Sequence, residues 1–202
     1  MVKACHDNTQ IPADTIDRDH MINIVTIGDS RYLVDVGFGS NSCPVQPVKL
    51  IHDTTGFENV DPASARLVWK SIAGSENQFQ KLWVYQHRIG SDKEFEDQYC
   101  FTDTEFRPND FQVMNWYTSS HPKALFTRMV VCNKMITGGD NDKIVGALLL
   151  QTALKRRVGK ESEQILEFKS EEDRVKALKE HFDIELSVAE QDAIKGTHTQ
   201  IL

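Results

Sequence analysis

The stretch "DHMINIVTIGDSRYLVDVGFGS", residues 19–40, decides the fold of the first part of the chain, because it has the pattern of one β-hairpin. Two runs rich in β-branched and aromatic residues, 21–27 and 30–38, flank the dipeptide Gly28-Asp29. A glycine followed by aspartate suits the tight primed turns that join antiparallel strands. The sequence therefore predicts two antiparallel strands joined by a two-residue turn.

The turn length also decides where His20 and Asp35 lie. With two turn residues, Asp35 faces Ile22, and His20 becomes its diagonal neighbour on the same face, roughly 7–8 Å away. A three-residue turn would shift the parity and place the two side chains on opposite faces. A carboxylate that holds one histidine nitrogen fixes the tautomer that a general base needs beside a nucleophile. The pair is thus either a catalytic dyad or a strand aspartate that satisfies backbone donors.

The four cysteines are widely separated and form no C-x-x-C pair, which argues against a zinc site and a disulfide framework. Cys100 and Cys132 lie in apolar settings and are predicted core residues. Cys5 and Cys43 are the local candidates for a nucleophile. Neither has a flanking motif that would favour a thiolate, such as the start of a strong helix.

Composition limits the classes of partner. The chain has 202 residues, of which 40% are hydrophobic, and a net charge of −7. The negative charge argues against nucleic acid and anionic membranes as partners. No apolar run is long enough to span a bilayer, and the first ten residues lack the apolar segment of a signal peptide. The sequence therefore predicts a cytosolic protein of one large domain or two small ones.

The middle of the chain continues this pattern with further strands and then a helix. Strand-like runs at 65–72 and 81–89 predict an antiparallel sheet or a small barrel. A helix is predicted to start at Pro108-Asn109-Asp110 and to stop before Pro122.

The last third reads as an α/β piece. Residues 127–137 are strand-like, whereas 142–158 are so continuously apolar that strand and helix both fit. Ser170 to Asp173 resemble an N-terminal cap, and a helix with Val175, Leu178 and Phe182 on one face is expected to follow.

Several of these segments match a known family. "HMINIVTIGDSRYLVDVGFG" at 20–39 resembles the central motif of arylamine N-acetyltransferases, in which a histidine and an aspartate fifteen positions later complete a Cys-His-Asp triad. The resemblance continues through 44–50, through "EFRPNDFQVMNWYTSSHPKALF" at 105–126, and through 145–187. It spans nearly the whole chain and looks closest to the fungal members.

The resemblance implies a mixed α+β fold with the architecture of the cysteine-proteinase-like superfamily. An antiparallel β-barrel domain is expected at 1–101, an interdomain segment at 102–136 and an α/β lid domain at 137–202. Family members also carry an N-terminal helical domain with R-G-G-x-C, which supplies the nucleophile. The sequence contains no R-G-G-x-C, so the chain resembles the second and third domains without the first and is expected to be inactive alone.

The resemblance also implies a ping-pong mechanism, in which a cysteine takes an acyl group from acetyl-CoA and passes it to an arylamine, hydrazine or arylhydroxylamine. Such enzymes act in xenobiotic metabolism. No metal is implied, and malonyl-CoA is an alternative donor. The carried-over site residues are catalytic His20 and Asp35, substrate-contacting Asp19 and Phe38, and coenzyme-A-contacting Tyr117 and Lys123.

Two other functions remain open. Cysteine-dependent hydrolases and transglutaminase-like proteins use Cys, His and Asp in the same chain order. A truncated paralogue could also bind coenzyme A or an arylamine without reacting.

Overall fold

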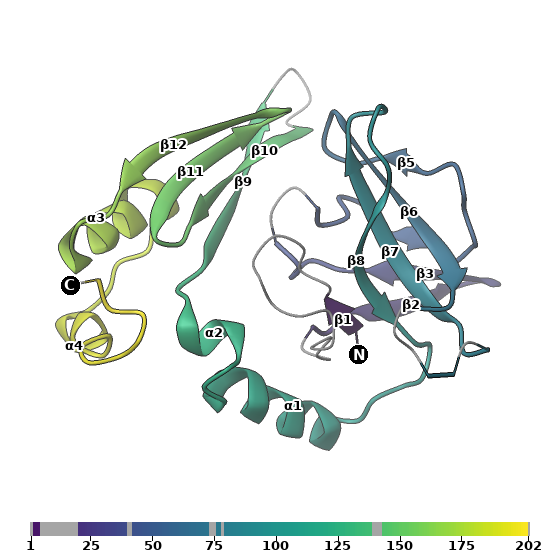
Figure 1. Cartoon of the computed structure of the whole chain (residues 1–202), viewed down its shortest axis with the longest axis horizontal. Helices are drawn as coiled ribbons and strands as arrows, with labels where there is room; N and C mark the ends of the chain where they lie inside the picture. The colour runs from purple at the N-terminus through teal and green to yellow at the C-terminus, as the bar shows by residue number, and fades with distance from the viewer. Residues whose placement is uncertain are drawn as a thin grey trace. The chain divides into compact units, whose positions relative to one another are not determined.

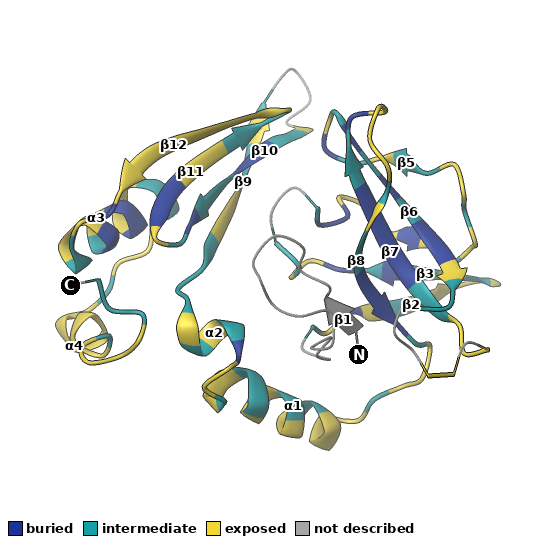
Figure 2. Ribbon diagram, in the orientation of Figure 1, coloured by how far each residue is buried: buried dark blue, intermediate teal, exposed yellow. Residues whose placement is uncertain are grey.

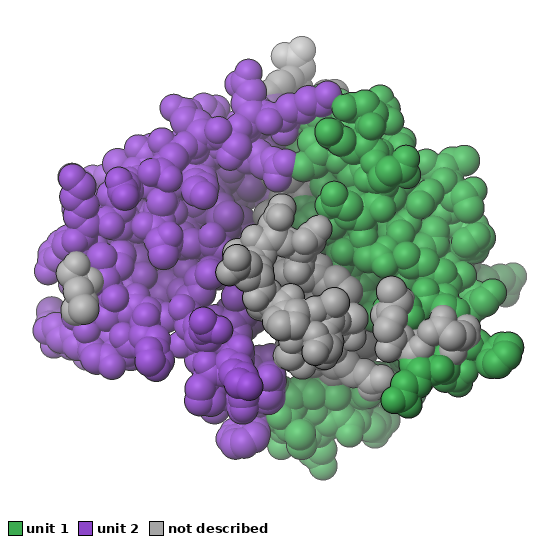
Figure 3. Space-filling model, viewed as in Figure 1, with its two compact units in different colours: residues 1–114 green, residues 115–202 purple. Residues whose placement is uncertain are grey.

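A computed structural model describes residues 2–4, 20–39, 42–72, 76–77, 79–138 and 143–201, the first three by their backbone alone. The chain divides into two compact units, residues 1–114 and 115–202 (Figure 3). The predicted boundaries after residues 101 and 136 stay predictions. Within the described residues, no helix has the length and apolar content to cross a lipid bilayer.

Unit 1 contains a five-stranded antiparallel sheet in the order β1-β8-β7-β6-β5 (Figure 1). Its two long central strands confirm the strands predicted at 65–72 and 81–89. The bounds are β1 Val2–Ala4, β5 Phe57–Glu58, β6 Ala63–Lys70, β7 Leu82–Ile89 and β8 Glu96–Phe101.

The predicted hairpin forms a second sheet of unit 1, with strands β2 Asn23–Ile27, β3 Ser30–Val34 and β4 Val48–Lys49. Ile27 pairs with Ser30, so the turn has two residues, as predicted. Gly28 has a φ of 57°, which a glycine adopts without steric cost. The turn thus fixes the parity of every side chain along the hairpin.

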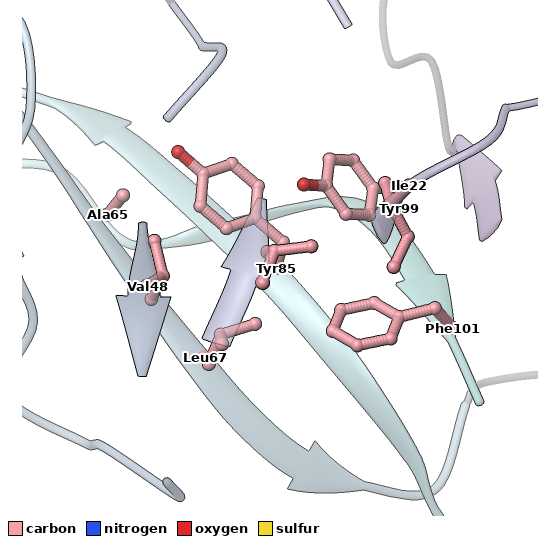
Figure 4. Close-up of a cluster of buried hydrophobic side chains, with 8 residues drawn as sticks. Ile22, Val48, Ala65, Leu67, Tyr85, Tyr99 and Phe101 are labelled. Carbon is pink, nitrogen blue, oxygen red and sulfur yellow. The ribbon is translucent and has the colours of Figure 1, made fainter. Parts of the chain in front are cut away.

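The core of unit 1 lies between these two sheets. Figure 2 shows buried stretches along β6, β7 and β8, and Figure 4 shows side chains of these three strands gathered with Val48 of β4 and Ile22. The cluster consists of Ile22, Leu33, Val48, Ala65, Leu67, Tyr85, Tyr99 and Phe101. Hydrogen bonding among the described residues leaves two separate sheets, so a closed barrel stays a prediction.

Helix α1, Pro108–Ser120, confirms the predicted start and end. Proline suits the first turn because its missing N–H has no helical partner there. The Asp110 carboxylate accepts from the Arg107 backbone N–H at 2.8 Å and thus caps the start. None of the helix's residues is buried (Figure 2).

Unit 2 begins with the last residues of α1 and the short helix α2, Leu125–Arg128, which the sequence did not predict. Its antiparallel sheet has the order β12-β11-β10-β9. Of the ambiguous stretch 142–158, residues 143–158 form a hairpin of two strands rather than a helix. The bounds are β9 Cys132–Gly138, β10 Lys143–Leu150, β11 Ala153–Val158 and β12 Glu161–Glu167.

Two helices follow this sheet, α3 Glu171–Phe182 and α4 Val188–Asp192. The Ser170 hydroxyl accepts from the Asp173 N–H at 3.2 Å, which confirms the predicted cap. Leu178 of α3 packs in a buried cluster with Leu150 and Leu154 of the sheet. A lid role for unit 2 stays a prediction.

We expect Gly146→Ala to destabilise unit 2 by about 1–3 kcal/mol. An added Cβ would lie 2.0 Å from the Arg157 carbonyl oxygen, so β10 and β11 would have to separate where Gly146 pairs with Val158. Gly138→Ala is the matched control, since its Cβ would meet only the Val145 side chain, at 3.3 Å. Urea unfolding measures both variants, and equal effects would contradict this account.

Candidate active site

His20 and Asp35 lie together at the open end of the hairpin, as a two-residue turn requires. His20 Nε2 lies 2.9 Å from Asp35 Oδ2. The Asp35 side chain is fully buried, while that of His20 keeps 16% of its surface exposed. The hairpin geometry therefore brings the two predicted residues into direct contact, with the imidazole on the solvent side.

The second carboxylate oxygen of Asp35 has backbone partners. Oδ1 accepts from the N–H groups of Gly37 at 3.0 Å and Phe38 at 3.2 Å. One oxygen of Asp35 thus satisfies backbone donors and the other holds the imidazole, and a catalytic role of the pair stays a prediction. Burial opposes ionisation, but the hydrogen bond and charge of His20, with the Gly37 N–H, lower the pKa of Asp35 below 3.8.

Aromatic rings surround the imidazole of His20. Phe38 meets it edge-on with ring centroids 5.4 Å apart, and Tyr99 lies 5.8 Å away. Among the described residues, nothing hydrogen-bonds His20 Nδ1. The nitrogen opposite the carboxylate is therefore available to a reacting group. A substrate contact by Phe38 stays a prediction.

Cys43 lies behind the dyad and does not face it as a nucleophile would. It is buried, and its Sγ donates to the Asp35 carbonyl oxygen at 3.4 Å. Burial and the negative charge of Asp35 raise the pKa of the Cys43 thiol above 9.0. A raised pKa keeps the sulfur protonated, which is the opposite of what a nucleophilic cysteine needs.

We expect iodoacetamide to modify Cys43 more slowly in the folded protein than in denaturant, since burial shields the sulfur and the raised pKa lowers its thiolate fraction. Peptide mapping by mass spectrometry measures both rates. Cys132 is the internal control, because it is only half-buried although burial also raises its pKa. Fast labelling of Cys43 that acyl-CoA suppresses would instead support a nucleophilic role.

Two of the remaining candidate residues, Asp19 and Cys5, lie outside the described residues. Cys100 is buried in an apolar cluster with Val68 and Val84, as predicted.

Tyr117 and Lys123 lie in unit 2, around the end of α1. The Tyr117 ring stacks on His121 with centroids 4.5 Å apart, and the Lys123 N–H donates to His121 Nδ1 at 3.2 Å. His121 therefore orders this segment. Coenzyme A binding by Tyr117 and Lys123 stays a prediction.

Sequence reasoning missed Tyr85 and Tyr99, which lie beside the dyad from β7 and β8. The Tyr99 hydroxyl is close enough to Asp35 to help lower the pKa of that carboxyl, although it makes no hydrogen bond of full geometry. Successive side chains of a strand point to opposite faces of the sheet, and this alternation could have placed both rings on the inner face. Their closeness to Asp35 depends on how the two sheets of unit 1 pack against each other.

The described residues contain no group of three or more His, Cys, Asp or Glu side chains that could hold a metal ion.

Comparison with known proteins gives consistent matches. Residues 2–191 match the family model described as N-acetyltransferase. N-malonyltransferase FDB2 of Gibberella moniliformis is 36% identical over 186 residues, which are 87% of this chain and 53% of that protein. Human arylamine N-acetyltransferase 1 is 30% identical over 83% of this chain and 58% of that protein. The chain thus spans about half the length of these relatives.

Solved structures share the fold. The arylamine N-acetyltransferase from Mycobacterium abscessus superposes with a TM-score of 0.74 at 18% identity, over 94% of this chain and 61% of that one. That of Mycobacterium marinum, solved in complex with CoA, gives 0.65 at 23% identity, over 93% and 60%.

Proposed function

The chain belongs to the arylamine N-acetyltransferase family, and on this premise we propose that His20 and Asp35 form the acid–base half of an acyl-transfer site. The reaction proposed is transfer of an acyl group from a coenzyme A thioester to an arylamine, hydrazine or arylhydroxylamine. The observation that carries the proposal is the 2.9 Å contact between His20 Nε2 and the fully buried Asp35 carboxylate.

In the proposed reaction, Asp35 accepts the N–H of His20 Nε2, so the lone pair of the neutral ring lies on Nδ1. Nδ1 takes the proton of a cysteine thiol, and the thiolate attacks the thioester carbonyl carbon. Coenzyme A leaves as its thiol with that proton. The amine then attacks the acyl-cysteine, and Nδ1 takes the amine proton and returns it to the cysteine sulfur. Asp35 stays ionised throughout and stabilises the imidazolium.

The nucleophile is not one of the cysteines that the structure describes. Cys43 and Cys132 have raised pKa values, and Cys100 is buried. We therefore place the nucleophile outside the described residues, either at Cys5 or on polypeptide beyond this chain.

The acyl donor has two candidates. Acetyl-CoA is the donor that the family name implies, whereas the relatives with 36% identity are named N-malonyltransferases. Both donors have the same thioester chemistry, so the dyad itself does not distinguish them. We propose coenzyme A thioesters as the donor class and test both.

The experiment mixes the 202-residue chain with acetyl-CoA or malonyl-CoA and 2-aminophenol, and detects N-acylated product by mass spectrometry. Product that disappears in His20→Ala supports the proposal, and Cys5→Ser then shows whether Cys5 supplies the sulfur. Calorimetric binding of coenzyme A without product would leave two alternatives, a nucleophile on polypeptide beyond this chain or a non-catalytic binding protein. Amide hydrolysis without N-acylation, or neither binding nor product, overturns the proposal.

A further inference from the structure

A small pocket lies in unit 1 where the chain passes from the hairpin sheet to the edge of the five-stranded sheet. Residues 49–51 make this passage in a tight turn, in which the Ile51 N–H donates to the Lys49 carbonyl oxygen at 2.8 Å. Two residues later, the Asp53 N–H donates to the Leu67 carbonyl oxygen of β6 at 2.8 Å. The pocket has a volume of about 200 Å³, and none of its lining residues belongs to the proposed acyl-transfer site.

One wall of the pocket is apolar. Val48 and Leu67 are 6% and 1% exposed and belong to the core cluster, and Phe57 packs against that cluster. Ile51 also lines the pocket but is 52% exposed, so an apolar ligand would remove some of its surface from water. A cavity of about 150 Å³ lined by apolar side chains is large enough to bind benzene. The pocket therefore has room for one aromatic ring with a short polar substituent.

Asp53 supplies a negative charge to the same pocket. Its Oδ1 accepts from the N–H groups of Thr55 at 2.8 Å and Gly56 at 3.3 Å, whereas its Oδ2 accepts no hydrogen bond from a described residue. Burial opposes ionisation, but these hydrogen bonds and the charge of Arg66 lower the pKa of Asp53 below 3.8. Asp53 is therefore ionised at neutral pH and has one oxygen left for a donor.

Lys49 supplies a positive charge. Its side chain is exposed, and its ammonium group forms no ion pair with any residue that the structure describes, Asp53 included. The Gln46 side chain adds an uncharged amide to the lining. A carboxylate and an ammonium group that line one apolar pocket without pairing with each other are complementary to a ligand that carries both charges.

We propose that this pocket binds a small zwitterion with an apolar side chain, which is the chemistry of a free hydrophobic amino acid. The ligand's ammonium group donates to Asp53 Oδ2, its carboxylate lies beside the Lys49 ammonium group, and its side chain packs against the apolar wall. A ligand with a carboxylate alone would leave the charge of Asp53 unmatched, and one with an amine alone would leave that of Lys49 unmatched. This site goes beyond the proposed acyl transfer and does not depend on it.

The test titrates the 202-residue chain with three probes that share one ring. They are L-phenylalanine, hydrocinnamate, which lacks the amino group, and phenethylamine, which lacks the carboxylate. The methyl NMR signals of Val48, Ile51 and Leu67 report binding at the pocket itself. We expect L-phenylalanine to shift these signals with a dissociation constant on the order of 1 mM. Each analogue with one charge should bind roughly threefold more weakly.

Two substitutions separate the two charges. Lys49→Met should weaken binding of L-phenylalanine and hydrocinnamate roughly threefold, but not that of phenethylamine. Asp53→Asn keeps an oxygen for the Thr55 and Gly56 N–H groups, and should weaken binding of L-phenylalanine and phenethylamine but not that of hydrocinnamate. Lys93→Met is the matched control, because Lys93 is an exposed lysine between β7 and β8 that does not line the pocket.

Three results would overturn the inference. If no probe shifts the three sets of methyl signals at concentrations about tenfold above the expected constant, the pocket binds no such ligand. If hydrocinnamate or phenethylamine binds as tightly as L-phenylalanine, the two charges do not select a zwitterion. If Lys93→Met weakens binding as much as Lys49→Met, Lys49 acts only through the net charge of the chain. Acyl transfer is not measured, so this inference and the proposed function can fail separately.

Discussion

Replacing Asp35 by Asn should lower N-acylation by roughly 10³–10⁴-fold, the largest effect that we expect of any single substitution here. Asparagine keeps the size of the side chain, and its oxygen can still accept from the Gly37 N–H. Its amide nitrogen, however, would donate to His20 Nε2. The neutral imidazole would then carry its proton on Nδ1, where it cannot act as a base.

The same substitution can be followed without turnover. Nitrogen NMR of His20 distinguishes the two neutral tautomers, and we expect the proton to move from Nε2 to Nδ1 in Asp35→Asn. Asp53→Asn is the matched control. Asp53 also caps backbone N–H groups through one oxygen, at Thr55 and Gly56, but its carboxylate contacts no histidine. An unchanged His20 tautomer would contradict the assigned role of Asp35.

Acid stability provides a second check on Asp35. Because the folded-state pKa is lower than the ordinary 3.8, Asp35 contributes stability above about pH 4 that is lost as pH falls through the folded-state pKa. Asp35→Asn should therefore flatten the loss of stability below pH 4.

The second large effect concerns Arg174→Met, which should destabilise unit 2 by about 3 kcal/mol. The Arg174 side chain is 5% exposed and forms an ion pair with Glu171, itself 19% exposed. Arg174 also donates to the Thr199 carbonyl at 2.8 Å, and Glu171 accepts from the Ile201 N–H at 2.7 Å. Methionine keeps most of the apolar volume but leaves the Glu171 carboxylate with no cation beside it.

Urea unfolding of the purified chain measures this loss, and hydrogen exchange locates it in α3 and the last residues. Lys176→Met is the control on the same helix, because Lys176 is 72% exposed and pairs with Glu180 only at 3.9 Å. We expect that control to change stability by less than about 0.5 kcal/mol. A double variant with Glu171→Gln should recover part of the loss, since the uncompensated charge is gone. Equal effects of Arg174→Met and Lys176→Met would contradict the prediction.

Local patterns explain which elements could be predicted from the sequence. The hairpin at 21–38 was predictable because a two-residue turn sets the register by itself. Helices α1 and α3 were predictable because Pro108 and Ser170 supply their starting signals within one turn of chain. Helix α2 was missed because it is only four residues long.

The stretch 142–158 was ambiguous for a different reason. Its apolar residues supply both faces of a hairpin, so no single periodicity appears in the sequence. The choice of strand over helix depends on partners, since β10 is paired on one side with β9 and on the other with β11.

The candidate site likewise has a part that local sequence determines and a part that depends on distant residues. The sequence by itself determined that His20 and Asp35 meet, because both belong to one hairpin and the turn fixes the distance between them. Only the tertiary structure decided what surrounds the pair. Tyr85 and Tyr99 lie 50 and 64 residues after Asp35 in the chain. The burial of Cys43 against Asp35 removes it as a nucleophile. Burial and pKa depend on packing between the two sheets, and packing over such separations leaves no periodic signal in the chain.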